Sequence, residues 1–455
     1  MSMLFREIID SPCGIRYMAD ALQLRSAVGR RLLLQSPMLD CAEQISCAYA
    51  KLREFHDKLI LSGLATRRST ARMIGIKLQG LKDCEATLQQ LTAGVDGDEV
   101  CFFEIKSLVL LCTQVQPLLT QAGITSVALP DLCTVRRLLD PDNTGIASFY
   151  VYDSYDEELG RLRRQIRSGS GDKETLLRAS REIEQQICHT LTESLRPYLM
   201  QLKEALSALA EVDLLLAKAM QLNELNLIFP AISTDGETTY RGLFHPEIRA
   251  ALEVTGKNYQ SVDVTYGQLP VTVIGANMGG KTVLLRSLAL SQYLFQFGFG
   301  IPATAATIRP VRQLFLRIGD ATAEQSGLSS FASEITEIGK ILATVREQSQ
   351  VLVLLDEPAR TTNPVEGTAL VSALVNLIGH SGAACVITTH YNLLHAQSRR
   401  LKVRGLSDKG MDYTLTEVAD GEVPHEALAV GRMLGVDAAW IDGAQQLLDQ
   451  AIKHE

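Results

Sequence analysis

The sequence lacks the features of a membrane protein, a disulfide framework or a cysteine metal site. No apolar run approaches the length of a membrane span, and Met1–Asp10 carries charges where a signal peptide would be apolar. The nine cysteines are scattered without a Cys-x-x-Cys pair, which favours reduced core thiols. We therefore expect a cytoplasmic protein that makes no membrane contact.

The chain also lacks the basic excess of a dedicated nucleic-acid binder. Its net charge is −8 and its pI about 5.6, which weighs against DNA as the main partner but leaves room for a local basic face. With 455 residues, 46% of them hydrophobic and 21% charged, the chain has the composition of a globular protein. That length suffices for two or three domains.

Helix-forming residues dominate the first half of the chain. From residue 1 to about 228, Leu, Ala, Gln, Glu and Arg prevail, and apolar residues recur at three-to-four spacing. This pattern predicts an almost wholly helical domain. A helix is predicted over Asp156–Ser168, a break at Gly169–Asp172, and one or two long helices from Lys173 to about Met220.

The second half alternates short apolar runs with helical patterns. A turn-rich stretch between about 228 and 270 marks the expected boundary, so the second domain is predicted over residues 229–455. The alternation predicts a parallel or mixed sheet covered by helices. The predicted strands are Val271–Ile274, Leu314–Ile318, Val351–Leu355 and Ala384–Thr388.

A phosphate-binding loop follows the first of these strands. The pattern Gly-x-x-x-x-Gly-Lys-Thr leads directly into an apolar-periodic helix, and this order favours a phosphate loop over a chance glycine-rich turn. Backbone N–H groups and the helix N-terminus would hold the phosphates of ATP. Lys281 would add a positive charge, and the Thr282 hydroxyl would bind Mg²⁺. The nucleotide-binding residues of this loop are Gly275, Asn277, Met278, Gly279, Gly280, Lys281 and Thr282.

Two carboxylates and a histidine are expected at the same edge of the sheet. Asp356 and Glu357 follow one apolar run and His390 follows another, and ligands of open α/β sheets bind at the carboxyl ends of the strands. Asp356 would hold Mg²⁺ through water, and Glu357 would orient or deprotonate the attacking water. His390 would hydrogen-bond the γ-phosphate or that water. An acidic helix start and an ordinary loop histidine are the plainer alternatives.

A serine- and glycine-rich block opens another predicted helix. Ser326, Gly327 and Ser329 lie just before the apolar stripe of that helix, where backbone and hydroxyl groups suit an anion. A plain helix N-cap fits the same residues, so both interpretations stay open.

These elements, in this order and spacing, resemble the MutS family of ABC-type phosphate-loop ATPases. Gly275–Thr282 is similar to the family's Gly-Pro-Asn-Met-Gly-Gly-Lys-Ser. Segments within Arg317–Glu337 resemble its Arg-x-Gly, Ser-Gly-x-Ser-Thr-Phe and Glu-x-Thr-Glu blocks. Asp356–Thr362 and Thr389–Tyr391 lie where the family has Asp-Glu-x-Gly-Arg-Gly-Thr and Thr-His-Tyr/Phe. The helical half resembles the family only weakly.

The resemblance implies an α/β phosphate-loop ATPase domain, residues 229–455, preceded by an all-α core and lever domain, residues 1–228. It also implies a head-to-tail homodimer, or a heterodimer with a paralogous subunit, joined by C-terminal helices at about 428–455. ATP binding and hydrolysis would close and open this dimer, which makes it a switch as well as an enzyme. Each ATP site would combine one subunit's Gly275–Thr282, Asp356, Glu357 and His390 with Ser326–Ser329 of the other.

Several parts of the family pattern are missing or altered. The helical core begins near residue 10, so we expect no mismatch-binding or connector domain before it. Only Gly169–Asp172 and about 45 further residues fill the interval where the family carries its DNA clamp. Ala359 and Thr361 replace two of the family's glycines, which puts the turnover rate in doubt.

Two functions fit this short form. The first is an ATP-driven remodelling factor for a client enzyme, similar to short MutS-like proteins that reactivate adenosylcobalamin-dependent aminomutases. The alternative is a MutS-like DNA-binding ATPase that acts on mismatched or branched DNA in repair or recombination. The acidic charge and the missing parts favour the first. A purely structural, non-hydrolysing protein is disfavoured by the intact Lys281, Asp356 and Glu357.

Overall fold

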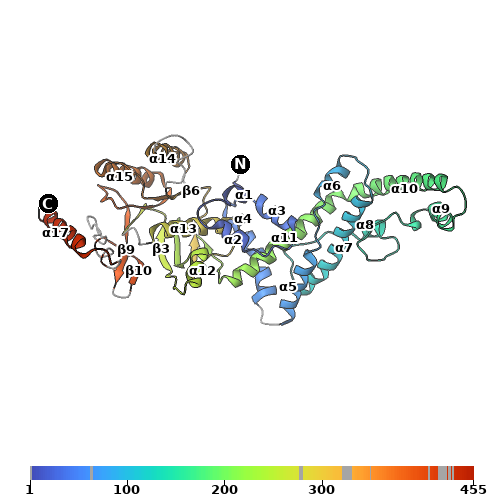
Figure 1. Ribbon diagram of the computed structural model, residues 1–455, viewed down its shortest axis with the longest axis horizontal. Helices are drawn as coiled ribbons and strands as arrows, with labels where there is room; N and C mark the ends of the chain where they lie inside the picture. Colours follow the sequence, from blue (N-terminus) through green and yellow to red (C-terminus); the bar gives the residue numbers. More distant parts are fainter. Residues whose placement is uncertain are drawn as a thin grey trace.

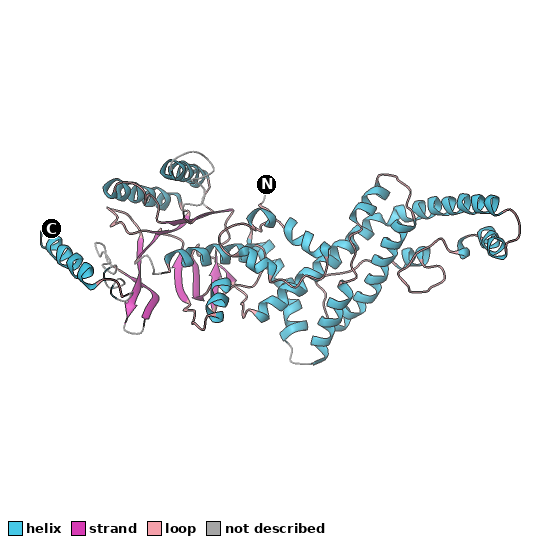
Figure 2. Ribbon diagram, viewed as in Figure 1, coloured by secondary structure: helices cyan, strands magenta, loops and turns pink. Residues whose placement is uncertain are grey.

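Every regular element described before Ala231 is a helix, and strands begin only after that point (Figure 2). The computed structural model describes residues 3–61, 65–275, 280–319, 330–348, 350–407, 410–418, 428, 432 and 435–454. The α-helices of the first half are α1 (Phe5–Ile8), α2 (Ile15–Asp20), α3 (Ala27–Gln35), α4 (Ala42–Phe55), α5 (Ala65–Leu78), α6 (Glu85–Thr92), α7 (Glu99–Ala122), α8 (Cys133–Leu139), α9 (Glu157–Ser168), α10 (Lys173–Leu195) and α11 (Leu199–Glu224).

Helices α9 and α10 form an arm at the end of the molecule farthest from the sheets (Figure 1). The predicted break between them is confirmed: Gly169 ends α9 with a left-handed φ of 71°, and the Asp172 side chain caps α10. Arg163 joins the two helices, because it binds Asp153 at 2.6 Å just before α9 and Glu184 of α10 at 2.9 Å. After α10 a single 3₁₀ turn leads into α11, so the long segment contains two helices.

Helix α7 is long and apolar enough, by length and composition, to cross a membrane. Our expectation that no segment approaches that length is therefore wrong for this helix. Most of its apolar window is buried within the protein, and it carries the buried Lys106. It packs as a core helix of the helical half.

Lys106 forms a buried ion pair with Asp140, which lies at the end of α8. The Lys106 Nζ is 3.0 Å from Asp140 Oδ1 and donates to the Tyr152 hydroxyl at 2.6 Å. Asp140 also accepts bonds from the backbone N–H groups of Thr144 and Gly145, at 3.0 and 2.8 Å. Burial opposes ionisation of Asp140, but the bonds from Thr144, Gly145 and Lys106 hold its pKa below the usual range. The network therefore fixes the loop that leads from the helical body to the arm.

The second half contains two sheets and the remaining helices (Figure 1). The strands are β1 (Ala231–Ile232), β2 (Thr238–Leu243), β3 (Val262–Tyr266), β4 (Val271–Ile274), β5 (Ala305–Ile308), β6 (Gln313–Arg317), β7 (Val351–Asp356), β8 (Ala384–Thr388), β9 (Arg399–Ser407) and β10 (Gly410–Glu417). The helices are α12 (Pro246–Val254), α13 (Lys281–Gln296), α14 (Ser330–Glu347), α15 (Pro364–Ser381) and α17 (Ala438–His454).

The larger sheet has the order β10-β9-β4-β8-β7-β6, and only β10 pairs antiparallel to its neighbour. All four predicted strands are confirmed in this sheet; β4 and β8 have the predicted bounds, and β6 and β7 differ by one residue. Strands β4, β7 and β8 end side by side, as the parallel pairing requires. This common edge places the ends of the predicted motifs together.

The smaller sheet, of order β1-β5-β2-β3, corrects our interpretation of residues 228–270. That stretch was expected to be a turn-rich boundary, but it holds β2, β3 and α12. Antiparallel pairing with β5, more than 60 residues later, completes the sheet. A partner this distant leaves no local pattern in the sequence.

Alternate residues of β7 belong to two buried clusters on opposite faces of the larger sheet. Leu352 and Leu354 join the cluster that contains α13, whereas Val351 and Val353 join the cluster under α14 and α15. The first cluster runs without interruption from Phe5 in the helical half into the sheet. The two halves therefore share a core, and the domain boundary near residue 228 stays a prediction.

A buried lysine joins this shared core to the helix that follows the phosphate loop. Lys218 of α11 donates from Nζ to the carbonyl oxygen of Phe297, one residue past α13, at 2.6 Å. The same Nζ lies 4.2 Å from the ring centre of Phe299. Tyr49 of α4 donates to the Phe299 carbonyl oxygen at 2.7 Å. The carboxyl end of α13 is thus bound directly to the helical half.

We expect Lys218 to make the stability of the protein depend on pH. Burial lowers the pKa of Lys218 to about 7, against a smaller opposing effect of Glu211. Between that value and the unfolded pKa of about 10.4, the unfolded chain binds a proton that the folded protein does not, so the free energy of unfolding rises with pH. In the wild type this rise in the free energy of unfolding should reach up to about 1.4 kcal/mol per pH unit, and Lys218→Met should abolish it. Denaturant unfolding of both proteins at pH 7, 8 and 9 measures the free energy of unfolding at each pH.

The exposed Lys340 of α14 provides the control. Lys340→Met should leave the dependence of stability on pH as it is in the wild type. If the difference between wild type and Lys218→Met stays constant from pH 7 to 9, Lys218 keeps its proton and the expectation is wrong.

Candidate functional site

The phosphate loop lies between β4 and α13. Gly275 ends the strand and Gly280 precedes the helix; Asn277, Met278 and Gly279 lie outside the residues that the structure describes. Gly280 has a φ of 73°, and a Cβ atom there would lie 3.0 Å from the ring of Tyr413. Only glycine meets both conditions without strain. Lys281 points back across the loop and donates to the Gly275 carbonyl oxygen at 2.6 Å.

Thr282 and Asp356, the two predicted Mg²⁺ ligands, lie in direct contact. The Thr282 hydroxyl donates to Asp356 Oδ2 at 2.6 Å, and the Thr388 hydroxyl donates to Asp356 Oδ1 at 2.6 Å. They come from the start of α13 and the end of β7, which parallel strands bring to one edge. A hydroxyl and a carboxylate are the hard oxygen donors that Mg²⁺ prefers, so the residues fit the ion.

Glu357 occupies the centre of the site. Its carboxylate lies 3.3 Å from Lys281 Nζ and 2.8 Å from His390 Nε2, so the structure brings all three predicted residues together. Its backbone N–H donates to the carbonyl oxygen of Thr388 at 3.1 Å, which ties it to the end of β8. Burial opposes ionisation of Glu357, but His390 and Lys281 outweigh this effect and lower its pKa to about 2. The carboxylate is therefore ionised at neutral pH.

The turn after Asp356 has an unusual backbone. Glu357 and Ala359 have φ values of 49° and 60°, in the left-handed region that side chains disfavour. The family that the sequence resembles carries glycine at the position of Ala359. The alanine thus keeps a glycine-type conformation, at a cost of about 1 kcal/mol or more.

Helix α14 lies beside this turn, and the predicted anion-binding residues Ser326, Gly327 and Ser329 lie outside the described residues that precede it. Arg317, at the end of β6, binds Glu334 of α14 at 2.6 Å and Glu337 at 3.0 Å. The expected apolar face is mostly buried, but Ile335 is exposed.

A cavity of about 510 Å³ adjoins the phosphate loop, and sequence reasoning missed its walls. Tyr259, Gln260 and Tyr413 line it together with Lys281 and Thr282. The Gln260 side chain donates to Asp412 at 2.9 Å and accepts from the backbone N–H of Tyr413 at 3.1 Å, which fixes this part of β10 beside Gly280. Aromatic and amide side chains beside a phosphate site suit a nucleoside. The cavity walls come from separate segments that share no motif, so no local signal identifies them.

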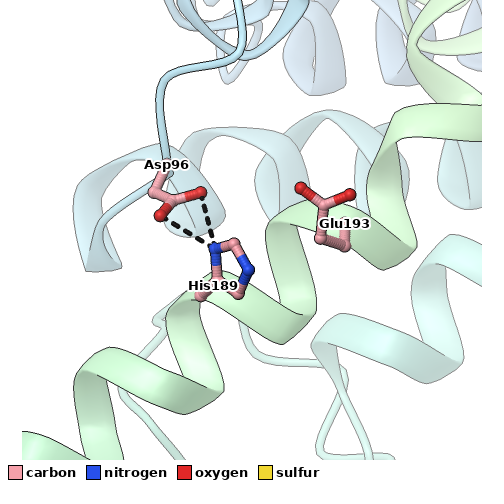
Figure 3. A group of neighbouring side chains, drawn as sticks. All are labelled: Asp96, His189 and Glu193. Carbon is pink, nitrogen blue, oxygen red and sulfur yellow. Dashed lines mark hydrogen bonds and ion pairs between the residues drawn. The ribbon is translucent and has the colours of Figure 1, made fainter.

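The described residues contain one further cluster that could hold a metal ion: Asp96, His189 and Glu193 (Figure 3). All three are exposed, and His189 Nδ1 is 3.0 Å from Asp96 Oδ2. Glu193 binds Arg196 at 3.0 Å. Because each side chain already has a partner, we interpret the cluster as ion pairs that hold α10 against the loop after α6.

The cysteines form neither disulfides nor a cluster of this kind. All nine are free, as expected, but the expectation that they are core residues is wrong for Cys47 and Cys133, which are exposed. The buried ones are Cys13, Cys84, Cys112 and Cys385.

Comparison with known proteins relates this site to one family. Residues 271–449 match MutS domain V. The chain is 32% identical over 277 residues to the protein named endonuclease MutS2 of Pediococcus pentosaceus, which covers 59% of this chain and 34% of that protein. It is 28% identical over 309 residues to the DNA mismatch repair protein MutS of Geobacillus kaustophilus, a match that covers 65% of this chain and 34% of that protein. The matches thus span about a third of the length of these relatives.

The match confirms the α/β phosphate-loop fold predicted for the second half, and ATP hydrolysis by this chain stays a prediction. The assignment of the helical half as a MutS core and lever stays a prediction. The chain is therefore related to the MutS family through its residues 271–449, which match domain V of that family.

Proposed function

We propose that the protein is a dimeric, ATP-driven switch that acts on DNA. Lys281 and the backbone of the phosphate loop bind the phosphates of ATP, and Thr282 and Asp356 hold Mg²⁺. The ion, when bound, neutralises charge on the phosphate oxygens. Glu357 accepts the proton of the attacking water or orients that water, and His390 positions Glu357 through their 2.8 Å contact.

The contact between Lys281 and Glu357 supports a simple order of events. Lys281 cannot give its full charge to both Glu357 and a phosphate group. When it turns to the phosphate, Glu357 loses one of the charges that keep its pKa near 2. A higher pKa makes Glu357 a better proton acceptor. Binding of ATP thereby makes Glu357 a stronger proton acceptor.

Dimerisation is part of the proposal because the resemblance to the MutS family implies that the Ser326–Ser329 block serves the site of the other subunit. The C-terminal helix α17 supports it. That helix extends away from the rest of the molecule, and its Trp440 and Leu447 are 68% and 69% exposed (Figure 1). Large apolar side chains on a protruding helix suit a partner surface.

Three exposed arginines of the arm support the proposal that the protein acts on DNA. Helices α9 and α10 contain seven Lys or Arg residues and six Glu residues, so the arm is nearly neutral in a chain whose net charge is −8. Arg164, Arg178 and Arg181 are exposed and make no ion pair with any described residue. Exposed arginines bind the phosphates of a nucleic-acid backbone. The names of the relatives, a mismatch repair protein and an endonuclease, agree with this choice.

A remodelling factor for a client enzyme, such as an aminomutase, is the second candidate. The acidic charge of the whole chain favours it. The comparisons support it less than they support the DNA function, because the relatives carry the names of DNA-processing proteins. The two candidates share the same ATPase mechanism and differ only in the molecule on which the protein acts, DNA or a client enzyme.

Binding to a branched DNA duplex separates them. We expect the full-length protein to bind this DNA and to hydrolyse ATP faster in its presence. The triple variant Arg164→Glu, Arg178→Glu, Arg181→Glu should lose 10-fold or more of its DNA affinity at about 0.1 M salt. The slope of log affinity against log salt should fall by about 3, since each lost phosphate contact contributes about 0.9. Fluorescence anisotropy over a salt series gives both values.

The matched control places three charge reversals outside the arm, at the exposed Arg6, Arg30 and Arg346. It should bind DNA almost as the wild type does. If the wild type neither binds DNA nor responds to it in ATP hydrolysis, or if both triple variants lose affinity equally, the arm does not serve as a DNA contact.

A further inference from the structure

Ala359 is held on both sides by side chains from other elements. Its N–H donates to Glu334 Oε1 of α14 at 3.1 Å, and its carbonyl oxygen accepts from the Tyr391 hydroxyl at 2.7 Å. Ala359 is 2% exposed, so its backbone groups need partners within the protein; the carbonyl oxygen also accepts a longer bond, 3.3 Å, from the backbone N–H of Thr362. The left-handed conformation of the residue, disfavoured for alanine, therefore has two specific restraints.

Tyr391 is itself fixed in place. Its backbone N–H donates to the Thr389 hydroxyl at 3.0 Å. Its hydroxyl group lies so close to Gly367, near the start of α15, that a Cβ atom there would have no room. The ring thus lies between α15 and the turn, and the hydroxyl has little freedom to leave Ala359.

The order of residues makes this contact relevant to catalysis. Tyr391 directly follows His390, which binds Glu357, and Ala359 lies two residues after Glu357. Two neighbouring side chains therefore hold two points of one short turn: the carboxylate of Glu357 and the carbonyl of Ala359. On the other side, Glu334 connects the turn to Arg317 and to the first turns of α14.

We propose that Tyr391 is a positioning residue for ATP hydrolysis: its hydroxyl holds Ala359 in the left-handed conformation that orients Glu357, while Glu334 links the same turn to α14. Tyr391 touches neither the nucleotide nor the water in this proposal. A shift of α14 would pass through Glu334 to the turn and change the orientation of Glu357. The proposal rests on the role of Glu357 as the hydrolytic residue, and it is independent of whether DNA is the load.

The test removes only the hydroxyl group. Tyr391→Phe in the full-length protein should lower the basal kcat for ATP by about tenfold, the effect of about one lost hydrogen bond on the barrier. The KM for ATP should stay within about twofold, because the phosphate loop is untouched. Tyr155→Phe is the matched control: its hydroxyl donates to a carbonyl oxygen, that of Leu138, at 2.6 Å, but in the helical half. This control should keep the wild-type kcat.

A second variant tests the strain directly. In Tyr391→Phe with Ala359→Gly, the turn adopts the left-handed conformation without the restraint, so kcat should return to within about threefold of the wild type. A purely structural role for the hydroxyl would lower thermal stability and would not respond to the glycine. The proposal is overturned if Tyr391→Phe keeps the wild-type kcat, or if glycine at 359 does not restore it. If the protein does not bind DNA, the expected kcat values of these variants stay the same. That result would contradict only the proposal that the protein acts on DNA.

Discussion

Glu357→Gln should bind ATP as the wild type does and hydrolyse it at least 100-fold more slowly. Glutamine has the size of glutamate and can still accept a hydrogen bond from Lys281, which contacts the carboxylate at 3.3 Å. It cannot take a proton from water at neutral pH, and general-base catalysis contributes about 10²- to 10⁴-fold. Phosphate release gives kcat, and binding of a fluorescent ATP analogue gives Kd.

The exposed Glu347 of α14 provides a matched control, because Glu347→Gln changes the same charge away from the site. It should keep wild-type kcat and Kd. Wild-type hydrolysis by Glu357→Gln would exclude Glu357 as the base. A loss of ATP binding in that variant would mean instead that the carboxylate serves to place Lys281 in the loop.

Asp140→Ala should have the largest effect on stability. The substitution leaves Lys106 buried with its charge uncompensated, because Lys106 and Asp140 are 1% and 3% exposed. Loss of one partner from a buried pair costs about 3–5 kcal/mol. The N–H groups of Thr144 and Gly145 also lose their acceptor. We expect the free energy of unfolding, measured with urea, to fall by this amount.

Two comparisons make that result specific. Asp142→Ala, at an exposed position in the same loop, should change stability by less than about 0.5 kcal/mol. Lys106→Met combined with Asp140→Ala removes both charges and should recover part of the loss. An equal loss for Asp140→Ala and Asp142→Ala would show that the loop, rather than the buried charge, determines the effect.

The parts of the site that the sequence predicted are those with local patterns. A strand such as Val351–Asp356 combines an apolar run with a following carboxylate, and its position in the sheet follows from parallel pairing. The phosphate loop is equally local, since its glycines, lysine and threonine lie within eight residues. The meeting of Glu357 with His390 was predictable as well, because both follow strands of one sheet.

What escaped prediction depends on contacts between distant segments. Tyr413 meets Gly280 across 133 residues, and nothing in its local sequence marks it. The bond from Tyr391 to Ala359 depends on the left-handed turn. The sequence of this turn contains no glycine, so it does not predict a left-handed conformation. The burial of Lys106 could not be predicted from the sequence. A single lysine in an apolar helix is expected at the surface unless a buried partner such as Asp140 is known.

The contacts of Lys218 and Tyr49 with the segment after α13 make the two halves of the chain structurally dependent on each other. A phosphate-loop domain is often treated as a module that can be exchanged among proteins. Here the carbonyl oxygen of Phe297, just after α13, accepts a bond from Lys218 of α11, and one buried cluster crosses the boundary. Exchange of the ATPase half with that of a relative would have to preserve Lys218, Tyr49 and the shape of Phe299 together. An exchange that does not match these contacts should therefore destabilise the protein.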